Sequence, residues 1–146
     1  MNYTCEIIID LPRDQVIELF DNPDNMKHWQ TGFISLEPLS GTPGQAGAQS
    51  KLTYQMGKRT IEMTETILSR DLPSEFSATY EAANVWNEVK NFFHEHGPDQ
   101  TRWVTEQTFR FGGFMKLMGW LMPGAFKKQS MKYLQDFKAF AESSER

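Results

Sequence analysis

The chain has 146 residues, including one cysteine, and carries 15 basic and 19 acidic residues for a formal net charge of −4. This length fits one domain, which we place at residues 1–146, and such a domain buries about two thirds of its unfolded surface without a disulfide or a metal. The mildly acidic charge argues against nucleic-acid binding, which depends on a basic surface. Eleven Phe, eight Met, four Trp and four Tyr predict a wide or irregular interior.

The N-terminal residues contain neither a basic cluster nor a long apolar run. We therefore expect no signal peptide and no membrane-spanning helix. A single cysteine cannot form an internal disulfide, and the expected location is the cytoplasm.

The first part of the chain has the pattern of a strand followed by two short helices. Apolar side chains alternate over residues 3–10, which is typical of a strand with one buried face. Pro12 stands where a helix can begin, and apolar residues from Val16 to Phe20 follow at helical spacing. Residues 24–29 form a second short helical segment.

Six further strands are predicted, because alternating segments are separated by short turns that contain Gly, Pro, Asn or Asp. They cover residues 33–39, 49–56, 59–70, 75–81, 85–95 and 101–111. Connections this short favour an antiparallel sheet, of seven strands in all. A sheet of that size twists and curls.

The last part of the chain changes to a helical period. Residues 125–142 form a long amphipathic helix, and residues 114–122 before it are apolar nearly all round but too few to cross a bilayer. Only one long helix is available to cover the sheet. The prediction is an α+β helix-grip fold, in which a curved seven-stranded antiparallel sheet wraps around the C-terminal helix. Space left between sheet and helix would be a ligand cavity.

Several short motifs resemble those of the START-like superfamily, also called SRPBCC, of the Bet v 1-like and polyketide cyclase/dehydrase type. They are Ile-Asp-Leu-Pro at 9–12, Val16 with Phe20 and Asp21, Asn25 to Trp29, Gly44 to Gly47, Asp71 to Pro73, and Phe137 to Glu142 in the terminal helix. The resemblance covers nearly the whole chain and implies the helix-grip fold. It also implies an apolar cup that binds lipids, sterols, polyketides or hormones, and in some members catalyses cyclisation or hydrolysis. No catalytic motif is shared across the superfamily, so no catalytic residue is transferred from it.

Strand and helix periodicity predict which side chains face the cavity. Its expected walls mix apolar with polar groups, and a buried polar group without a partner costs about 1–3 kcal/mol. Either these polar groups pair with one another or they contact a ligand with polar groups of its own. The expected ligand-binding residues are Tyr54, Met56, Met63, Glu65, Tyr80, Asn87, Asn91, Trp103, Thr105, Gln107, Phe126, Ser130, Tyr133 and Phe137.

Glu65 is the candidate catalytic residue. It lies between Met63 and Ile67 on one strand face, where burial should raise the pKa of its carboxyl. It could act as a general acid or base with the hydroxyl of Tyr54 or Tyr80, in cyclisation, dehydration or hydrolysis of a bound ketone or ester. The alternative is a Glu hydrogen-bonded to Asn or Tyr that only shapes the cavity. The sequence therefore leaves two classes of function open. One is a carrier of a small hydrophobic ligand, and the other is a polyketide cyclase/dehydrase-like enzyme.

The apolar segment 114–122 is flanked by lysines, which could favour a transient contact with an anionic membrane surface. The alternatives are a core helix with solvated lysines, or docking onto a partner, including a second copy of the chain in a homodimer. His94 and His96 share a strand face but lack an evident third ligand, so we expect neither a metal site nor a cofactor.

Overall fold

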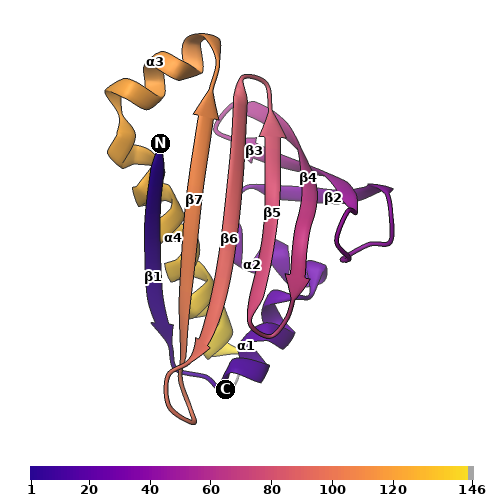
Figure 1. Cartoon of the computed structure of the whole chain (residues 1–146), viewed down its shortest axis with the longest axis vertical. Coiled ribbons are helices and arrows are strands. Elements are labelled where there is room, and N and C mark those ends of the chain that lie inside the picture. Colours follow the sequence, from indigo (N-terminus) through magenta and orange to yellow (C-terminus); the bar gives the residue numbers. More distant parts are fainter. Residues whose placement is uncertain (145–146) are drawn as a thin grey trace.

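Seven strands form one antiparallel sheet in the computed structural model, which describes residues 1–144 (Figure 1). Their order across the sheet is β1-β7-β6-β5-β4-β3-β2, so the first and last strands of the chain lie next to each other. The strands are β1 (Asn2–Ile9), β2 (Phe33–Ser40), β3 (Gln49–Met56), β4 (Arg59–Asp71), β5 (Glu75–Ala82), β6 (Val85–Glu95) and β7 (Thr101–Phe111).

The helices lie where the periodicity predicts them. They are α1 (Arg13–Phe20), the short 3-10 helix η1 (Pro23–Asn25), α2 (Met26–Trp29), α3 (Gly113–Leu121) and α4 (Pro123–Ser143). Proline stands at the first position of η1 and of α4, where its fixed φ favours a helix start and its missing N–H costs nothing. Pro123 thus separates the apolar segment, α3, from the long helix.

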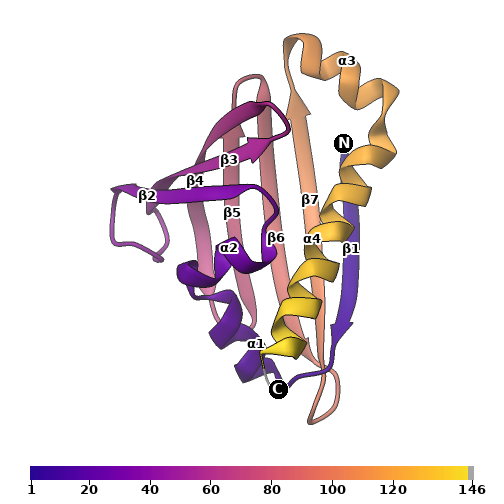
Figure 2. The same ribbon diagram turned by 180° about the vertical axis from the view of Figure 1, so that it is seen from behind.

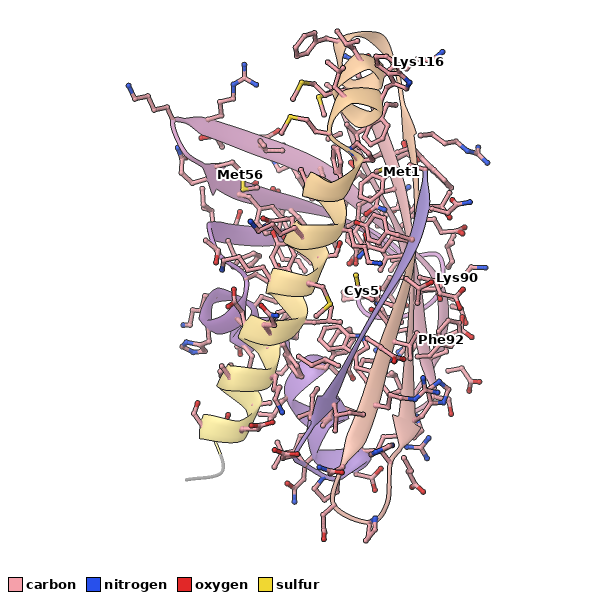
Figure 3. The ribbon with its side chains drawn as sticks, turned by 90° about the vertical axis from the view of Figure 1, so that its left-hand side faces the viewer. Met1, Cys5, Met56, Lys90, Phe92 and Lys116 are labelled. Atoms are coloured by element: carbon pink, nitrogen blue, oxygen red, sulfur yellow. The ribbon has the colours of Figure 1, made fainter. Side chains whose placement is uncertain are left out.

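α4 crosses one face of the curved sheet, with α1 and α2 at one end of it and α3 at the other (Figure 2). The side chain of Cys5 lies on the α4 side of the sheet, whereas Lys90 and Phe92 lie on the opposite face (Figure 3). The predicted helix-grip fold is confirmed: a curved antiparallel sheet holds its C-terminal helix on one side.

The aromatic core lies at the α1 and α2 end of the sheet. Phe137 of α4 is fully buried, and its ring centroid lies 5.0 Å from that of Trp29 and 5.3 Å from that of Trp103. Phe20 and Phe93 pack edge to face in the same cluster, at 5.0 Å. Such edge-to-face contacts between rings add to the free energy gained by burial alone.

The structure places Phe137 apart from the other expected ligand-binding residues. Phe137 belongs to the aromatic core but not to the cavity lining, whereas Trp29 and Trp103 of the same core also line the cavity. Its place in the apolar stripe of α4 correctly predicts that it faces the sheet, but the stripe does not distinguish the end of the helix that packs from the end that leaves space.

Across residues 1–144, no helix combines the length and the apolar character needed to cross a bilayer.

Replacing Phe137 with Ala should lower the free energy of unfolding by about 3–5 kcal/mol, because it opens a void in a packed aromatic cluster. Urea unfolding followed by circular dichroism measures the change. The matched control is Phe114→Ala, which removes an exposed ring and should change stability by no more than about 0.5 kcal/mol. Equal losses in the two variants would contradict this assignment of the core.

Candidate functional site

A cavity of about 640 Å³ lies between the sheet and the N-terminal half of α4. All the expected ligand-binding residues except Phe137 line it. They are Tyr54, Met56, Met63, Glu65, Tyr80, Asn87, Asn91, Trp103, Thr105, Gln107, Phe126, Ser130 and Tyr133. The volume lies in the range of pockets that hold drug-sized molecules.

A belt of polar side chains crosses the cavity wall from strand to strand. The sheet register pairs Ser50 of β3 with Glu65 of β4, Glu65 with Tyr80 of β5, and Tyr80 with Asn87 of β6. All four side chains line the cavity, because paired residues in neighbouring strands point to the same face. Apolar residues such as Leu52, Met63 and Val89 lie on either side of this belt along their strands.

Glu65 and Tyr80 form the central pair of the belt. The Tyr80 hydroxyl donates a hydrogen bond of 2.9 Å to Oε2 of Glu65, and Oε1 of Glu65 accepts none from residues 1–144. Burial raises the pKa of the Glu65 carboxyl, although the hydrogen bond from Tyr80 opposes that shift. Burial and the neighbouring carboxylate also raise the pKa of Tyr80, so its phenol stays protonated at neutral pH.

Tyr54 lies in the same wall but bonds elsewhere. Its hydroxyl donates to Oε1 of Gln30, which follows α2. Of the two tyrosines expected beside Glu65, Tyr80 is thus the hydrogen-bonded partner. Sequence reasoning missed Gln30, because it follows the last residue of a short helix and belongs to no periodic pattern.

A second polar network joins the sheet to α4. The Tyr3 hydroxyl lies 2.6 Å from the Ser130 hydroxyl and donates to the Phe126 backbone oxygen at 3.0 Å, with the Gln107 side-chain oxygen 3.3 Å away. Asn87 donates to the same Gln107 oxygen at 3.5 Å. Tyr3 also lines the cavity, and the expected ligand-binding residues do not include it. These contacts tie the helix to the sheet directly above the cavity.

The remaining polar groups of the wall lie deeper. Nε1 of Trp103 donates to the Asn91 side-chain oxygen at 3.0 Å, so these two expected residues pair with each other. The Thr105 hydroxyl is buried without a hydrogen-bond partner among the described residues. Most polar groups of the wall therefore pair with protein groups, which was one of the two possibilities that the sequence left open. Several of them still keep unused hydrogen-bonding capacity.

An ion pair lies at the edge of the cavity that faces the β2–β3 loop. The guanidinium of Arg70 on β4 contacts both carboxylate oxygens of Asp21, with distances of 2.7 Å and 2.5 Å. Both residues and the loop residues Pro43 to Gln45 contribute to the lining. The pair links the end of α1 to the sheet at this opening.

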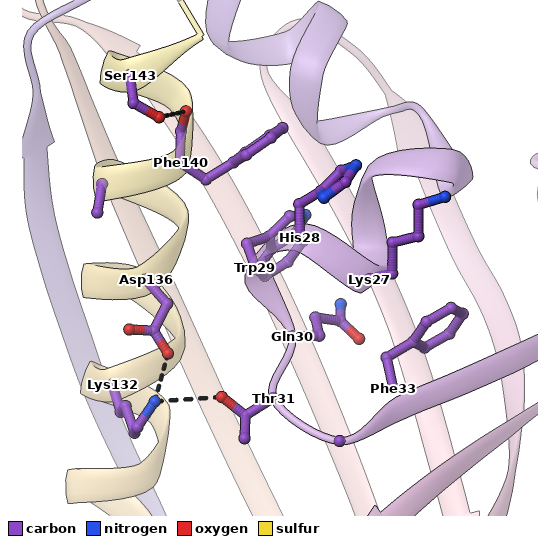
Figure 4. Close-up of a pocket in the computed structure, with 12 residues that line it drawn as sticks. Lys27, His28, Trp29, Gln30, Thr31, Phe33, Lys132, Asp136, Phe140 and Ser143 are labelled. Atoms are coloured by element: carbon purple, nitrogen blue, oxygen red, sulfur yellow. Dashed lines mark hydrogen bonds and ion pairs between the residues drawn. The ribbon is translucent and has the colours of Figure 1, made fainter.

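A second hollow, of about 720 Å³, lies on the outside of the molecule between α2 and the C-terminal half of α4 (Figure 4). Lys132 bonds there to Asp136 and to the Thr31 hydroxyl, and the His28 ring stacks on Phe140. Lys132 and Asp136 are thus already paired, and about half of the lining side chains are open to solvent. The inner cavity is therefore the better candidate for a ligand site.

Within residues 1–144, the His, Cys, Asp and Glu side chains form no group of three or more that could hold a metal ion.

Comparison with protein families agrees with this geometry. A family model described as polyketide cyclase / dehydrase and lipid transport matches residues 2–142. The chain belongs to this family. The resemblance to the START-like superfamily is thereby confirmed. No curated protein matches the sequence.

Solved structures of the same fold include members with an enzymatic description. An aromatase/cyclase from a Streptomyces species has a TM-score of 0.81 at 12% identity, with 100% of this chain and 96% of that chain covered. A norcoclaurine synthase point mutant from Thalictrum flavum, in complex with a transition-state analogue, has a TM-score of 0.73 at 12% identity, with coverage of 100% and 96%. A conserved protein from Geobacillus kaustophilus has a TM-score of 0.81 at 16% identity, with coverage of 99% and 97%. At these identities the likeness shows the shared fold.

The raised pKa of Glu65 predicts how stability depends on pH. The folded protein holds the Glu65 proton more tightly than the unfolded chain does, so this residue lowers the free energy of unfolding as pH rises from the unfolded pKa through the folded one. The variant Glu65→Gln lacks this titration. Relative to the wild type it should therefore become more stable as pH rises from acid to neutral, as measured by urea unfolding at several pH values.

Glu62→Gln is the matched control, because Glu62 is exposed on the opposite face of the same strand. It should leave the pH dependence of stability close to that of the wild type. A pH-independent difference between Glu65→Gln and the wild type would contradict the burial of the Glu65 charge.

Proposed function

We propose that this protein binds a small, mostly apolar molecule that carries one or more polar groups, in the cavity between the sheet and α4. The observation that carries the proposal is the cavity wall, in which a polar belt from Ser50 to Asn87 lies between apolar residues of the same strands. A lipid or a polyketide has this combination of an extended apolar body and a few hydrogen-bonding groups. The description of the family, which includes both lipid transport and polyketide chemistry, supports the same class of ligand.

The polar groups of the wall favour an oxygen-bearing ligand over a pure hydrocarbon. Glu65 and Tyr80 are half-buried, which leaves them in reach of a molecule in the cavity. Protonated Glu65 could donate to a carbonyl or hydroxyl oxygen, and ionised Glu65 could accept from a hydroxyl. Asn87 and Gln107 add amide groups on the neighbouring strands. The cytoplasmic location expected from the sequence stays a prediction.

Filling the cavity should abolish ligand uptake. Val89→Phe places a larger side chain inside the cavity and should weaken binding of the dye ANS at least about tenfold, or 1.4 kcal/mol. Fluorescence titration measures the dissociation constant. Mass spectrometry of the solvent-extracted wild type should also find a co-purified apolar molecule that is depleted in the variant.

Val104→Phe is the matched control, because residue 104 lies on the outer face of β7, opposite Phe92 of β6. It should bind ANS as the wild type does. If both variants bind the dye with unchanged affinity, the dye does not enter the cavity. If, in addition, no molecule co-purifies with the wild type, the binding proposal fails.

The Glu65–Tyr80 pair favours a second candidate function, a cyclase/dehydrase-like enzyme. A carboxylate with a raised pKa can take a proton from the carbon beside a ketone carbonyl, since its basicity is closer to that needed at neutral pH. The electron pair of the broken C–H bond then moves onto the carbonyl oxygen. Once Glu65 has taken the proton, the Tyr80 hydroxyl could turn from the carboxyl group and donate its hydrogen bond to that oxygen instead. Tyr80 is close enough to Glu65 to serve the same bound molecule.

Deuterium exchange into acetylacetone, followed by NMR in heavy water, tests the enzymatic function. The wild type should accelerate exchange above the buffer rate, and Glu65→Gln should reduce that acceleration by about 10²-fold or more. Glu62→Gln should retain it. Acceleration that survives in Glu65→Gln would remove the enzymatic candidate and leave the binding proposal standing.

A further inference from the structure

Large apolar side chains cover the outer face of α3. Phe114 is 70% exposed and Trp120 is 77% exposed, and Leu117, Leu121 and Met122 are exposed as well. Residues 114, 117 and 121 lie on one side of the helix, because positions three, four and seven apart are neighbours on a helix surface. A helix that faced only water would carry polar residues there.

The inner face of α3 fixes this orientation. Gly119 is buried against Phe111 of β7, and a Cβ added at this glycine would lie 2.7 Å from the Phe111 ring. Met115 and Met118 are half-buried on the same side. The helix therefore packs on Phe111 through its smallest residue, and Trp120 stays exposed. The sequence-based alternative of a core helix with solvated lysines does not describe α3.

The charge around α3 differs from that of the rest of the chain. Residues 107–135 contain five basic and no acidic side chains, which leaves ten basic and nineteen acidic residues elsewhere. A protein with a net charge of −4 thus has one purely basic segment, and it is the segment with the exposed aromatic rings.

Three lysines of this segment are available to a partner. Arg110 lies 4.6 Å above the Trp86 ring and Lys132 pairs with Asp136, but Lys116, Lys127 and Lys128 form no ion pair within residues 1–144. All three are exposed. Lys116 projects from α3 away from the body of the molecule (Figure 3).

We propose that α3 and the first turns of α4 dock onto the surface of an anionic lipid bilayer. Exposed Trp and Phe side chains are suited to the boundary between head groups and acyl chains, and neighbouring lysines are attracted by anionic lipids. A second copy of this chain fits the face less well, because two basic segments would repel each other. The docked helix lies along the membrane and does not cross it.

Docking would also place the cavity beside the lipid. Phe126, in the first turn of α4, lines the cavity and packs against Phe111, the residue on which α3 rests. A ligand that entered at this end would pass directly between bilayer and cavity. This last step rests on the proposed function, whereas the docking itself does not.

Co-sedimentation with vesicles tests the docking. The full-length protein should bind phosphatidylcholine vesicles that contain about one third phosphatidylserine, bind pure phosphatidylcholine vesicles much less, and be released at about 0.5 M salt. Trp120→Glu should lower the partition coefficient at least about tenfold, and so should replacement of Lys116, Lys127 and Lys128 together with Gln.

Leu68→Glu is the matched control, because it adds the same charge at a leucine that is 46% exposed on β4. It should bind vesicles nearly as the wild type does. Val89→Phe should also keep vesicle binding, so that failure of docking and failure of the cavity proposal can be told apart. The proposal is overturned if the wild type binds neither vesicle, or if Trp120→Glu binds like the wild type. It is also overturned if light scattering shows a dimer that Trp120→Glu dissociates, while no vesicle is bound.

Discussion

The uneven packing of α4 against the sheet determines the rest of the structure. Towards its C-terminal end, Leu134, Phe137 and Ala141 are buried in a continuous aromatic and aliphatic core. Nearer its N-terminus, Phe126, Ser130 and Tyr133 face the cavity, and Leu134 lies where the core and the cavity meet. The buried half provides the apolar contact that a single covering helix must supply, which leaves the other half free to be held by a few polar contacts. Stability and binding capacity are thus assigned to different turns of the same helix.

The polar contacts above the cavity have a structural role of their own. At this end of α4 a cavity, and not packed side chains, separates the helix from the sheet. Polar contacts are therefore needed to hold the helix in position. The hydroxyl of Tyr3 supplies them by bonding to Ser130 and to the backbone oxygen of Phe126. These bonds hold α4 over the cavity without filling it. The side-chain amides and the carboxyl group on the strands keep hydrogen-bonding capacity that a ligand can use.

Sequence reasoning located the fold and most of the cavity wall, since both follow from local periodicity. Alternation in β3 to β7 fixes which side chains share a face, and the polar belt contains three of the residues so predicted, Glu65, Tyr80 and Asn87. Phe137 does not line the cavity, because the depth at which a helix residue meets a sheet depends on sheet curvature. Gln30 and the Asp21–Arg70 pair were not foreseen. Both are contacts between distant segments, and no spacing within the sequence encodes them.

The position of the single cysteine gives a way to observe motion in this molecule. Cys5 is buried under α4, with its sulfur 3.8 Å from the backbone oxygen of Lys127, and burial raises the pKa of its thiol. An alkylating reagent can reach this sulfur only when the helix separates locally from β1. The rate of alkylation under native conditions therefore reports how often α4 separates from β1. A bound ligand that contacts both the helix and the sheet would slow the alkylation.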